Sequence, residues 1–278
     1  MQPTLYKYTP VNTDEYMNRL RRLLAGQLYF SSPLHFNDPF EMSPLLVPPT
    51  RDEMEKAFKL IGWEPDQMER AVRRRFVADV EHALAGQSKP AVSREWLESI
   101  GVACFSTIGD DLLMWAHYAT NHGGLCLGFD SNYGPFSSAR PVEYSSERPR
   151  IPAVRVLQTD ELLVRNVLLR KSEHWGYEKE WRAVKRPIRQ DELDYYSELV
   201  NEDHSKADEI ADVLASEGGP GHYEFNPLAI RRVLLGARMP NDKKKEVIDL
   251  LRSQCPHVKI FEMQLDPRYF RLYMTKAR

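Results

Sequence analysis

The segment Trp175–Arg182 holds the residues of this chain that are best suited to chemistry. If it is a β-strand, its side chains alternate between two faces, and Glu178, Glu180 and Arg182 share one of them. Two neighbouring carboxylates repel each other, so one holds a proton or takes a cationic partner. The flanking aromatic residues favour burial, and a buried carboxylate needs a partner such as Arg182 or Lys171. The alternative is an exposed strand whose charged residues pair with neighbouring strands.

Three further segments combine aromatic and polar residues, a combination that suits a pocket that stacks a planar ligand and hydrogen-bonds its edges. These segments are Tyr6–Tyr8, Phe36–Glu41 and Met114–Tyr118, the last with His122 close behind it. Together with the acidic segment, they supply the candidate ligand-binding residues Tyr8, Asn37, Trp115, Tyr118 and Tyr177.

Some of these positions also have ordinary structural interpretations. His117 is a candidate general base or ligand-edge donor, although a lone helical histidine more often belongs to the core or the surface. Asn37 and Asp38 precede a proline, which is typical of a turn in which such side chains bond their own backbone. We expect Glu41, just beyond this turn, to be exposed.

The overall composition limits the classes of function. The chain has 278 residues, with 38 basic against 40 acidic residues and a formal charge of −2. This balance indicates neither nucleic acid nor an anionic membrane as the partner. The three cysteines (Cys104, Cys126 and Cys255) lack the spacing of a zinc site, so we expect reduced thiols and no metal. Without a leader-like N-terminus or a long apolar run, we expect a cytoplasmic protein.

The order of apolar runs, caps and turns predicts a single α+β domain over residues 1–278, with a mixed, mostly antiparallel sheet. A helical insertion or lid is expected at about 50–100, where Thr50 and Glu53 have capping-box spacing, and a polar surface excursion at about 190–222. Further helices are expected from Thr13 or Asp14 to Gly26, from Asp110 or Asp111 to Ala119, and over 159–169 and 241–253. The expected strands cover 5–8, 28–32, 101–106, 125–129, 142–144, 175–182, 232–236, 258–265 and 270–274.

Five blocks of the chain together resemble a widespread bacterial family of unknown function. The resemblance spans nearly the whole chain and depends on the combination of blocks, because each block alone is weak. It implies no activity. The blocks are Phe36–Glu41, Cys104–Ser106, Met114–Tyr118, Gly124–Phe129 and Trp175–Arg182.

A more distant resemblance is to the ADP-ribosyltransferase superfamily, through a first strand with a basic residue, a helix, a strand ending in Ser-Ser and a late Glu-x-Glu strand. It implies a split sheet with a helical insertion, and NAD as substrate. Lys7 and Ser31 or Ser32 would hold NAD, and Glu180 would stabilise the oxocarbenium-like ribose as nicotinamide leaves. Glu178 matches an accessory acidic position that activates the acceptor in some members. Lys7 departs from the usual His or Arg, and lysine lacks the planar bidentate contacts of arginine.

The leading expectation is an enzyme that uses NAD to modify a macromolecule, protein or nucleic acid, or that hydrolyses NAD. Bacterial proteins of this kind often serve as toxins or in phage defence. One alternative is a metal-dependent nuclease or hydrolase with Asp38, His117, Glu178 and Glu180 around a divalent ion. The other is a non-catalytic module that senses a nucleotide through an aromatic pocket.

Overall fold

The computed structural model describes residues 3–50, 52–53, 74, 92, 94–152, 167–188, 190–207, 210 and 217–277. The chain forms two compact units. Unit 1 consists of Met1–Pro33, Glu98–Val142 and His174–Arg278, and unit 2 consists of Leu34–Leu97 and Glu143–Glu173. The prediction of a single domain concerns the two units together and stays a prediction.

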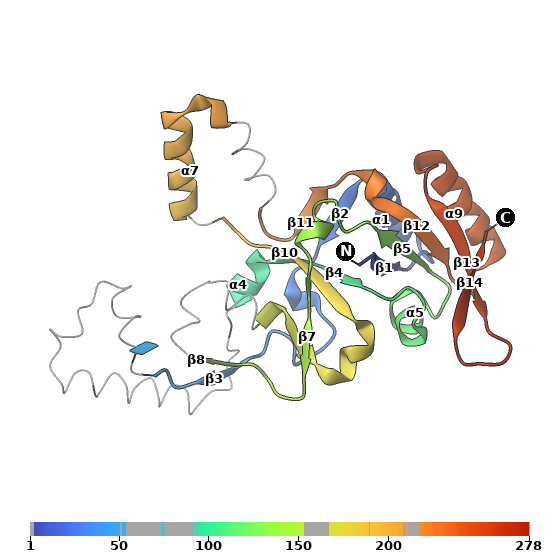
Figure 1. Cartoon of the computed structure of the whole chain (residues 1–278), viewed down its shortest axis with the longest axis horizontal. Coiled ribbons are helices and arrows are strands. Elements are labelled where there is room, and N and C mark those ends of the chain that lie inside the picture. The colour runs from blue at the N-terminus through green and yellow to red at the C-terminus, as the bar shows by residue number, and fades with distance from the viewer. Residues whose placement is uncertain are drawn as a thin grey trace. The chain divides into compact units, whose positions relative to one another are not determined.

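An eight-stranded sheet forms the centre of unit 1, in the order β14-β13-β12-β5-β1-β4-β10-β6 (Figure 1). Only β12 and β13 run parallel; every other neighbouring pair is antiparallel. The predicted α+β class with a mixed, mostly antiparallel sheet is therefore confirmed. The strands are β1 (Leu5–Thr9), β4 (Gly101–Ser106), β5 (Leu125–Phe129), β6 (Arg140–Pro141), β10 (Glu180–Lys185), β12 (Ile230–Leu235), β13 (Lys259–Leu265) and β14 (Leu272–Lys276).

Two separate cores cover the two faces of this sheet. Helices α1 (Asp14–Leu24) and α9 (Asn241–Gln254) pack on one face, where Leu5 and Leu127 join their core. Helix α5 (Leu112–Tyr118) packs on the other face with Tyr8 and Cys126. Because side chains alternate along a strand, β1 and β5 contribute to both cores. We call the face under α5 the α5 face.

The predicted caps explain where the helices of unit 1 begin and end. The Thr13 side chain accepts a hydrogen bond from the backbone N–H of Tyr16 at the start of α1, and Asp111 accepts two such bonds at the start of α5. After α1 the chain turns at Gly26, whose φ of 88° lies in the left-handed region that favours glycine. These boundaries agree with the predicted ones.

The predicted strand over 175–182 is wrong in its first half. Residues Glu173–Glu178 form the 3-10 helix η5, and β10 starts only at Glu180. Lys179 between them has a φ of 45°, which turns the chain from the helix into the strand. The physical reason is packing: Tyr177 joins the core beneath α5 instead of alternating across the sheet.

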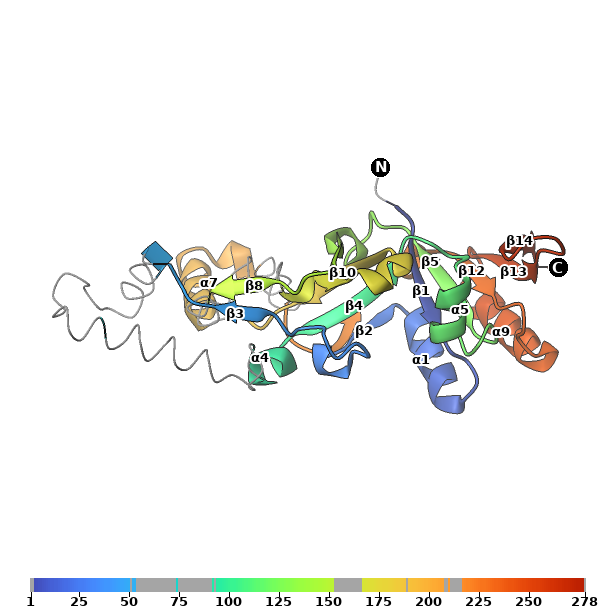
Figure 2. The same ribbon diagram turned by 90° about the horizontal axis from the view of Figure 1, so that it is seen from below.

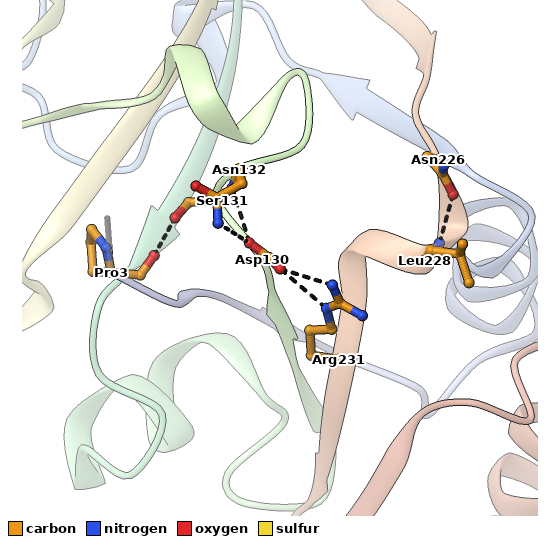
Figure 3. A network of polar contacts seen from close by, with 7 residues as sticks. All are labelled: Pro3, Asp130, Ser131, Asn132, Asn226, Leu228 and Arg231. Carbon is orange, nitrogen blue, oxygen red and sulfur yellow. Dashed lines mark hydrogen bonds and ion pairs between the residues drawn. The ribbon is translucent and has the colours of Figure 1, made fainter. Parts of the chain in front are cut away.

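Asp130 ties together the end of β5 and the start of β12 (Figure 3). Its carboxylate accepts hydrogen bonds from the backbone and side chain of Asn132 and from the guanidinium of Arg231. The Asn132 N–H, followed by Arg231, lowers the pKa of Asp130 below its ordinary value. Next to it, Ser131 donates to the carbonyl of Pro3 at 2.6 Å, which attaches the start of the chain to β5.

Other elements of unit 1 lie outside the main sheet. β2 (Gln27–Phe30) pairs with β11 (Gly221–Glu224), and residues 190–222 contain α7 (Gln190–Glu202) and the 3-10 helix η6 (His204–Lys206). Within the described ranges, no helix is long and apolar enough to cross a membrane. The remaining short elements of unit 1 are η3 (Phe136–Ser138) and η7 (Pro227–Ala229), whereas η1 (Pro33–His35) and α4 (Arg94–Ser99) span the boundaries between the segments of the two units.

Unit 2 contains two small parallel sheets. β3 (Leu45–Val47) pairs with β8 (Arg150–Pro152), and β7 (Glu143–Ser145) pairs with β9 (Arg170–Ser172). The predicted capping box is confirmed, since the Glu53 carboxylate accepts from the Thr50 N–H at 2.8 Å and Thr50 Oγ1 accepts from the Glu53 N–H at 3.3 Å. Most of the predicted helical insertion, and the predicted helix from 159 up to 166, lie outside the described residues.

The close approach of backbone at Gly236 gives a test of unit 1. A methyl group there would lie 2.1 Å from the carbonyl oxygen of His122 and 2.7 Å from that of Gly124. We expect Gly236→Ala to lower the free energy of unfolding by about 2 kcal/mol or more, because neither backbone oxygen can move away freely. Gly176→Ala is the matched control, since no atom lies within 4 Å of its added methyl. Equal urea midpoints for the two variants would contradict this packing.

Candidate functional site

Strand register brings three polar side chains into one row on the α5 face. Tyr6 of β1 lies opposite Ser106 of β4, and Ser106 lies opposite Glu180 of β10. Residues directly opposite each other in an antiparallel pair point to the same face. Cys104 and Arg182 form the next row along β4 and β10, which run side by side in both views (Figure 1 and Figure 2). These five residues are the candidate site.

Arg182 holds Glu180 by a buried, two-pronged ion pair. Its Nε donates to Oε1 at 2.8 Å and its Nη2 donates to Oε2 at 2.9 Å. Glu180 is 6% and Arg182 is 1% exposed, so both charges are removed from water. The predicted cationic partner of the acidic segment is thus confirmed as Arg182. Such a contact fixes the orientation of the carboxylate.

Glu178 lies at the end of η5 and joins it to α5. Its carboxylate accepts a hydrogen bond of 2.6 Å from the Tyr118 hydroxyl, and its backbone carbonyl accepts one of 2.6 Å from Ser106 Oγ. Glu178 is 2% exposed. The rings of His117 and Tyr177 lie 6.3 Å apart, with His117 exposed to solvent. The two predicted segments, Met114–Tyr118 and Trp175–Arg182, therefore do meet in space.

Trp115 and Tyr8, which were predicted to bind ligand, lie in the core. Trp115 is 0% and Tyr8 is 8% exposed, and their rings meet edge to face at 5.4 Å. The Trp115 Nε1–H donates to the carbonyl of Gly109 at 3.0 Å, and the Tyr8 hydroxyl donates to that of Ile108 at 2.8 Å. Both side chains thus hold the loop between β4 and α5 in place.

The side chains of Lys7 and Glu180 leave the sheet on opposite faces. Tyr6 and Glu180 are both registered with Ser106 and share its face, and Lys7, the next residue of β1, points to the other face. The Lys7 ammonium donates to the Cys104 carbonyl at 3.3 Å and lies 5.5 Å from the centre of the Phe105 ring. Burial lowers the pKa of Lys7, while the nearby Cys104 and Glu180 act in the opposite direction. Lys7 is therefore a desolvated cation close to the backbone of β4.

Of the two serines predicted to hold NAD, Ser31 shares the α5 face with Glu180. Its backbone exchanges hydrogen bonds of 2.9 and 2.8 Å with Val102, which precedes Cys104 by two residues on β4. Ser32 is buried. Asn37 belongs to unit 2 and is exposed there.

Although it belongs to the Cys104–Ser106 block, Cys104 was not predicted as a site residue. It lies opposite Arg182 and is half-buried. Burial first, and then the charge of Glu180 and a hydrogen bond with it, raise the pKa of the Cys104 thiol above its ordinary value of 9.0. Tyr6 and Ser106 were likewise not predicted as site residues, because only the long-range register of β1, β4 and β10 places them beside Glu180.

In unit 2, the predicted turn is present but Glu41 is not exposed. Asp38 Oδ1 accepts from the backbone N–H of Phe40 at 2.9 Å. Glu41 lies 3.9 Å from the ammonium of Lys171, and their side chains are only 2% and 4% exposed. The expectation that Glu41 is exposed is wrong, because its ion partner Lys171 is carried inward by β9.

The metal-dependent alternative needs a cluster of ligands. Across the described residues, no group of three or more His, Cys, Asp or Glu side chains is placed to hold a metal ion. Glu178 and Glu180 are instead engaged by Tyr118 and Arg182. This arrangement gives the metal alternative no support.

A family model described as a protein of unknown function (DUF2971) matches residues 114–183. The matched stretch begins in α5 and ends in β10, so it contains the Met114–Tyr118 segment, β5 and the whole Trp175–Arg182 segment. The Phe36–Glu41 and Cys104–Ser106 blocks lie outside it. The predicted resemblance to a family of unknown function is confirmed for this stretch only. No curated protein and no solved structure matches the chain.

Removing one partner of the buried ion pair tests its role in the fold. We expect Arg182→Met to lower the free energy of unfolding by about 3–5 kcal/mol, because it leaves the Glu180 carboxylate buried and unpaired. The double variant Glu180→Leu, Arg182→Met removes both charges, so it should recover most of that loss. Urea unfolding of the two single variants and the double variant gives the coupling energy. Additive losses would contradict a direct buried pair.

The buried acids of this face predict a loss of stability at alkaline pH. Burial raises the pKa of Tyr6 and Tyr8 above 10.0 and that of Cys104 and Cys126 above 9.0. A raised pKa stabilises the fold fully below the unfolded-state value, and this stabilisation is lost as the pH rises further. Lys7 and Lys185, whose pKa values are lowered by burial, act in the opposite direction, but among the described residues they are two groups against six, because burial also raises the pKa of Tyr223 and Cys255.

We therefore expect the free energy of unfolding to fall above about pH 9. Tyr8→Phe should flatten this fall, at a cost of about 1 kcal/mol at neutral pH for the lost hydrogen bond to Ile108. The matched control is Tyr195→Phe, whose ring is 57% exposed. An alkaline slope that is the same in wild type and Tyr8→Phe would count against this assignment.

Proposed function

We propose that this protein is an ADP-ribosyltransferase-like enzyme that cleaves NAD at the bond between ribose and nicotinamide. The observation that carries the proposal is the Glu180 carboxylate, oriented by Arg182 in one row with Tyr6 and Ser106. A fixed anion in a dry site stabilises positive charge that develops on a substrate. Glu180 would act on the ribose in this way.

The layout of the strands around Glu180 supports the proposal. β1 and β4 share the single registered pair Tyr6–Ser106, and Ser31 instead takes the place beside Val102. The two central strands are therefore paired at Tyr6 and Ser106 and diverge from there towards Val102, which is compatible with a split sheet. Ser31 and Glu180 lie on the same face, and in the proposal Ser31 contacts the nucleotide.

In the proposed chemistry Glu180 stabilises the positive charge on the ribose, and another residue takes up the proton. As the ribose–nicotinamide bond breaks, its electron pair leaves with nicotinamide, and the ribose carries the positive charge. Water or an acceptor nucleophile then forms a new bond to the ribose carbon from which nicotinamide has left, and it loses its proton. His117 is solvent-exposed beside Tyr177, so we assign it the role of proton acceptor. Glu178, bonded to the Tyr118 hydroxyl, positions α5 and η5.

A second candidate function is a module that binds a nucleotide without turning it over. One observation favours it: both carboxylates already have strong partners, Arg182 for Glu180 and Tyr118 for Glu178. Carboxylates that are held in this way can orient a bound nucleotide without taking part in a reaction.

The proposal is tested by incubating the protein with NAD, in the presence and absence of EDTA, and measuring the released nicotinamide by chromatography. We expect release that persists in EDTA and falls about 10²-fold in Glu180→Gln, the size typical of a lost electrostatic contact. Glu192→Gln on α7, where Glu192 pairs with Arg186, is the matched control and should keep its activity.

The other outcomes distinguish the alternatives. Release abolished by EDTA in the wild type would favour the metal-dependent hydrolase. NAD binding by calorimetry without release would favour the sensing module. If the protein neither binds NAD nor releases nicotinamide, the proposal is overturned. A thermal melt of Glu180→Gln shows whether a loss of activity is a loss of fold.

A further inference from the structure

The two edges of the eight-stranded sheet differ in how they are protected. At one edge, β6 has only two residues, Arg140 and Pro141, and a short strand with proline is a common device against edge-to-edge pairing. At the other edge, β14 has five residues and no proline. Its outer side has no strand partner among the residues that the structure describes. β14, drawn in red, lies at the rim of unit 1 in both views (Figure 1 and Figure 2).

The exposed edge also carries a group of exposed apolar side chains. Phe270 in the β13–β14 turn is fully exposed, and both faces of β14 beyond Leu272 lie in solvent. Two members of the group, Tyr273 and Met274, belong to β14 itself, and the others lie at the end of β13 or in the turn before β14. The group consists of Leu265 at 59%, Tyr269 at 63%, Tyr273 at 44%, Met274 at 45% and Phe270.

The hydrogen bonds inside the hairpin show which backbone groups face outward. Ala277 donates to Ile260 at 3.0 Å, and Asp266 donates to the carbonyl of Arg271 at 3.1 Å, so residues 271 and 277 face β13. By the alternation of an antiparallel ladder, 273 and 275 also face β13. The N–H and C=O groups of 272, 274 and 276 therefore point to the open edge.

We propose that a second copy of this chain pairs with β14 in antiparallel fashion about a two-fold axis at Met274. In this register, Met274 lies opposite its own copy, and 272 lies opposite 276 of the other copy. All three outward-facing residues of each strand are then hydrogen-bonded, so the two sheets become continuous. The pairing is self-complementary, as a two-fold interface requires.

The side chains agree with this register. Tyr273 comes to lie opposite Thr275 of the other copy, an aromatic and β-branched pair that stabilises antiparallel strands. Lys276 lies opposite the buried Leu272, so no like charge is directly opposed. Arg268 and Arg271, with Asp266 bound to Arg271, form a polar rim beside the apolar centre. The inference does not depend on the proposed function.

Cysteine cross-linking tests the register directly. In Met274→Cys the two new thiols lie in a hydrogen-bonded pair with Cα atoms about 5.5 Å apart, within reach of a disulfide. We expect a covalent dimer on mild oxidation. Thr275→Cys is the matched control, because the residue opposite it is Tyr273, so it should stay monomeric on a denaturing gel. The wild type controls for the native thiols.

Sedimentation or light scattering across the micromolar range tests the association itself. Met274→Pro removes only an outward-facing N–H, so it should leave the β13–β14 ladder intact and weaken association at least about tenfold. Circular dichroism checks that the variant is folded, and Tyr195→Ala is an exposed aromatic control on α7. A wild type that is monomeric throughout, or a dimer that Met274→Pro leaves unchanged, overturns the proposal. Binding of another macromolecule at this edge by a monomeric wild type overturns it as well.

Discussion

The buried ion pair between Glu180 and Arg182 is the interaction on which the candidate site depends. Two charges taken out of water at this depth are tolerable only because each completes the other's hydrogen bonds. This requirement fixes the direction of both side chains on β10. It also fixes the surroundings of Cys104, whose thiol lies against the pair and is kept protonated by burial and by the Glu180 charge.

A chain of hydrogen bonds connects this pair to the rest of the α5 face. Ser106 accepts from the N–H of Ile108 and donates to the carbonyl of Glu178, while the Glu178 carboxylate accepts from Tyr118. The loop after β4, η5 and α5 are thereby held as one assembly above Glu180. The stretch matched by the family of unknown function, 114–183, begins in α5, includes η5 and reaches into β10, so it contains Glu180 and Arg182. Tyr6, Cys104 and Ser106 of the candidate site lie outside it.

Local signals predicted much of the fold, and long-range register explains what they missed. The caps at Thr13 and Asp111 placed the first helices of unit 1 correctly, because cap chemistry depends on neighbours along the chain. The turn at Lys179 was not predictable from the alternation, since it arises from the packing of Tyr177 under α5. Tyr6 and Ser106 lie in segments that have sequence signals of their own, but no local signal places them beside Glu180. They become site residues only because β1, β4 and β10 are neighbours in this sheet.

Arg182 decides what kind of chemistry Glu180 can perform. At an effective dielectric constant of about 20, a substrate cation about 4 Å from the carboxylate is stabilised by ~4 kcal/mol. Repulsion from a guanidinium about 8 Å from that cation destabilises it by ~2 kcal/mol. The remaining ~2 kcal/mol corresponds to a rate factor of roughly 30. In the proposed reaction the guanidinium therefore halves the electrostatic stabilisation that Glu180 gives to a substrate cation, and it also fixes the direction of the carboxylate.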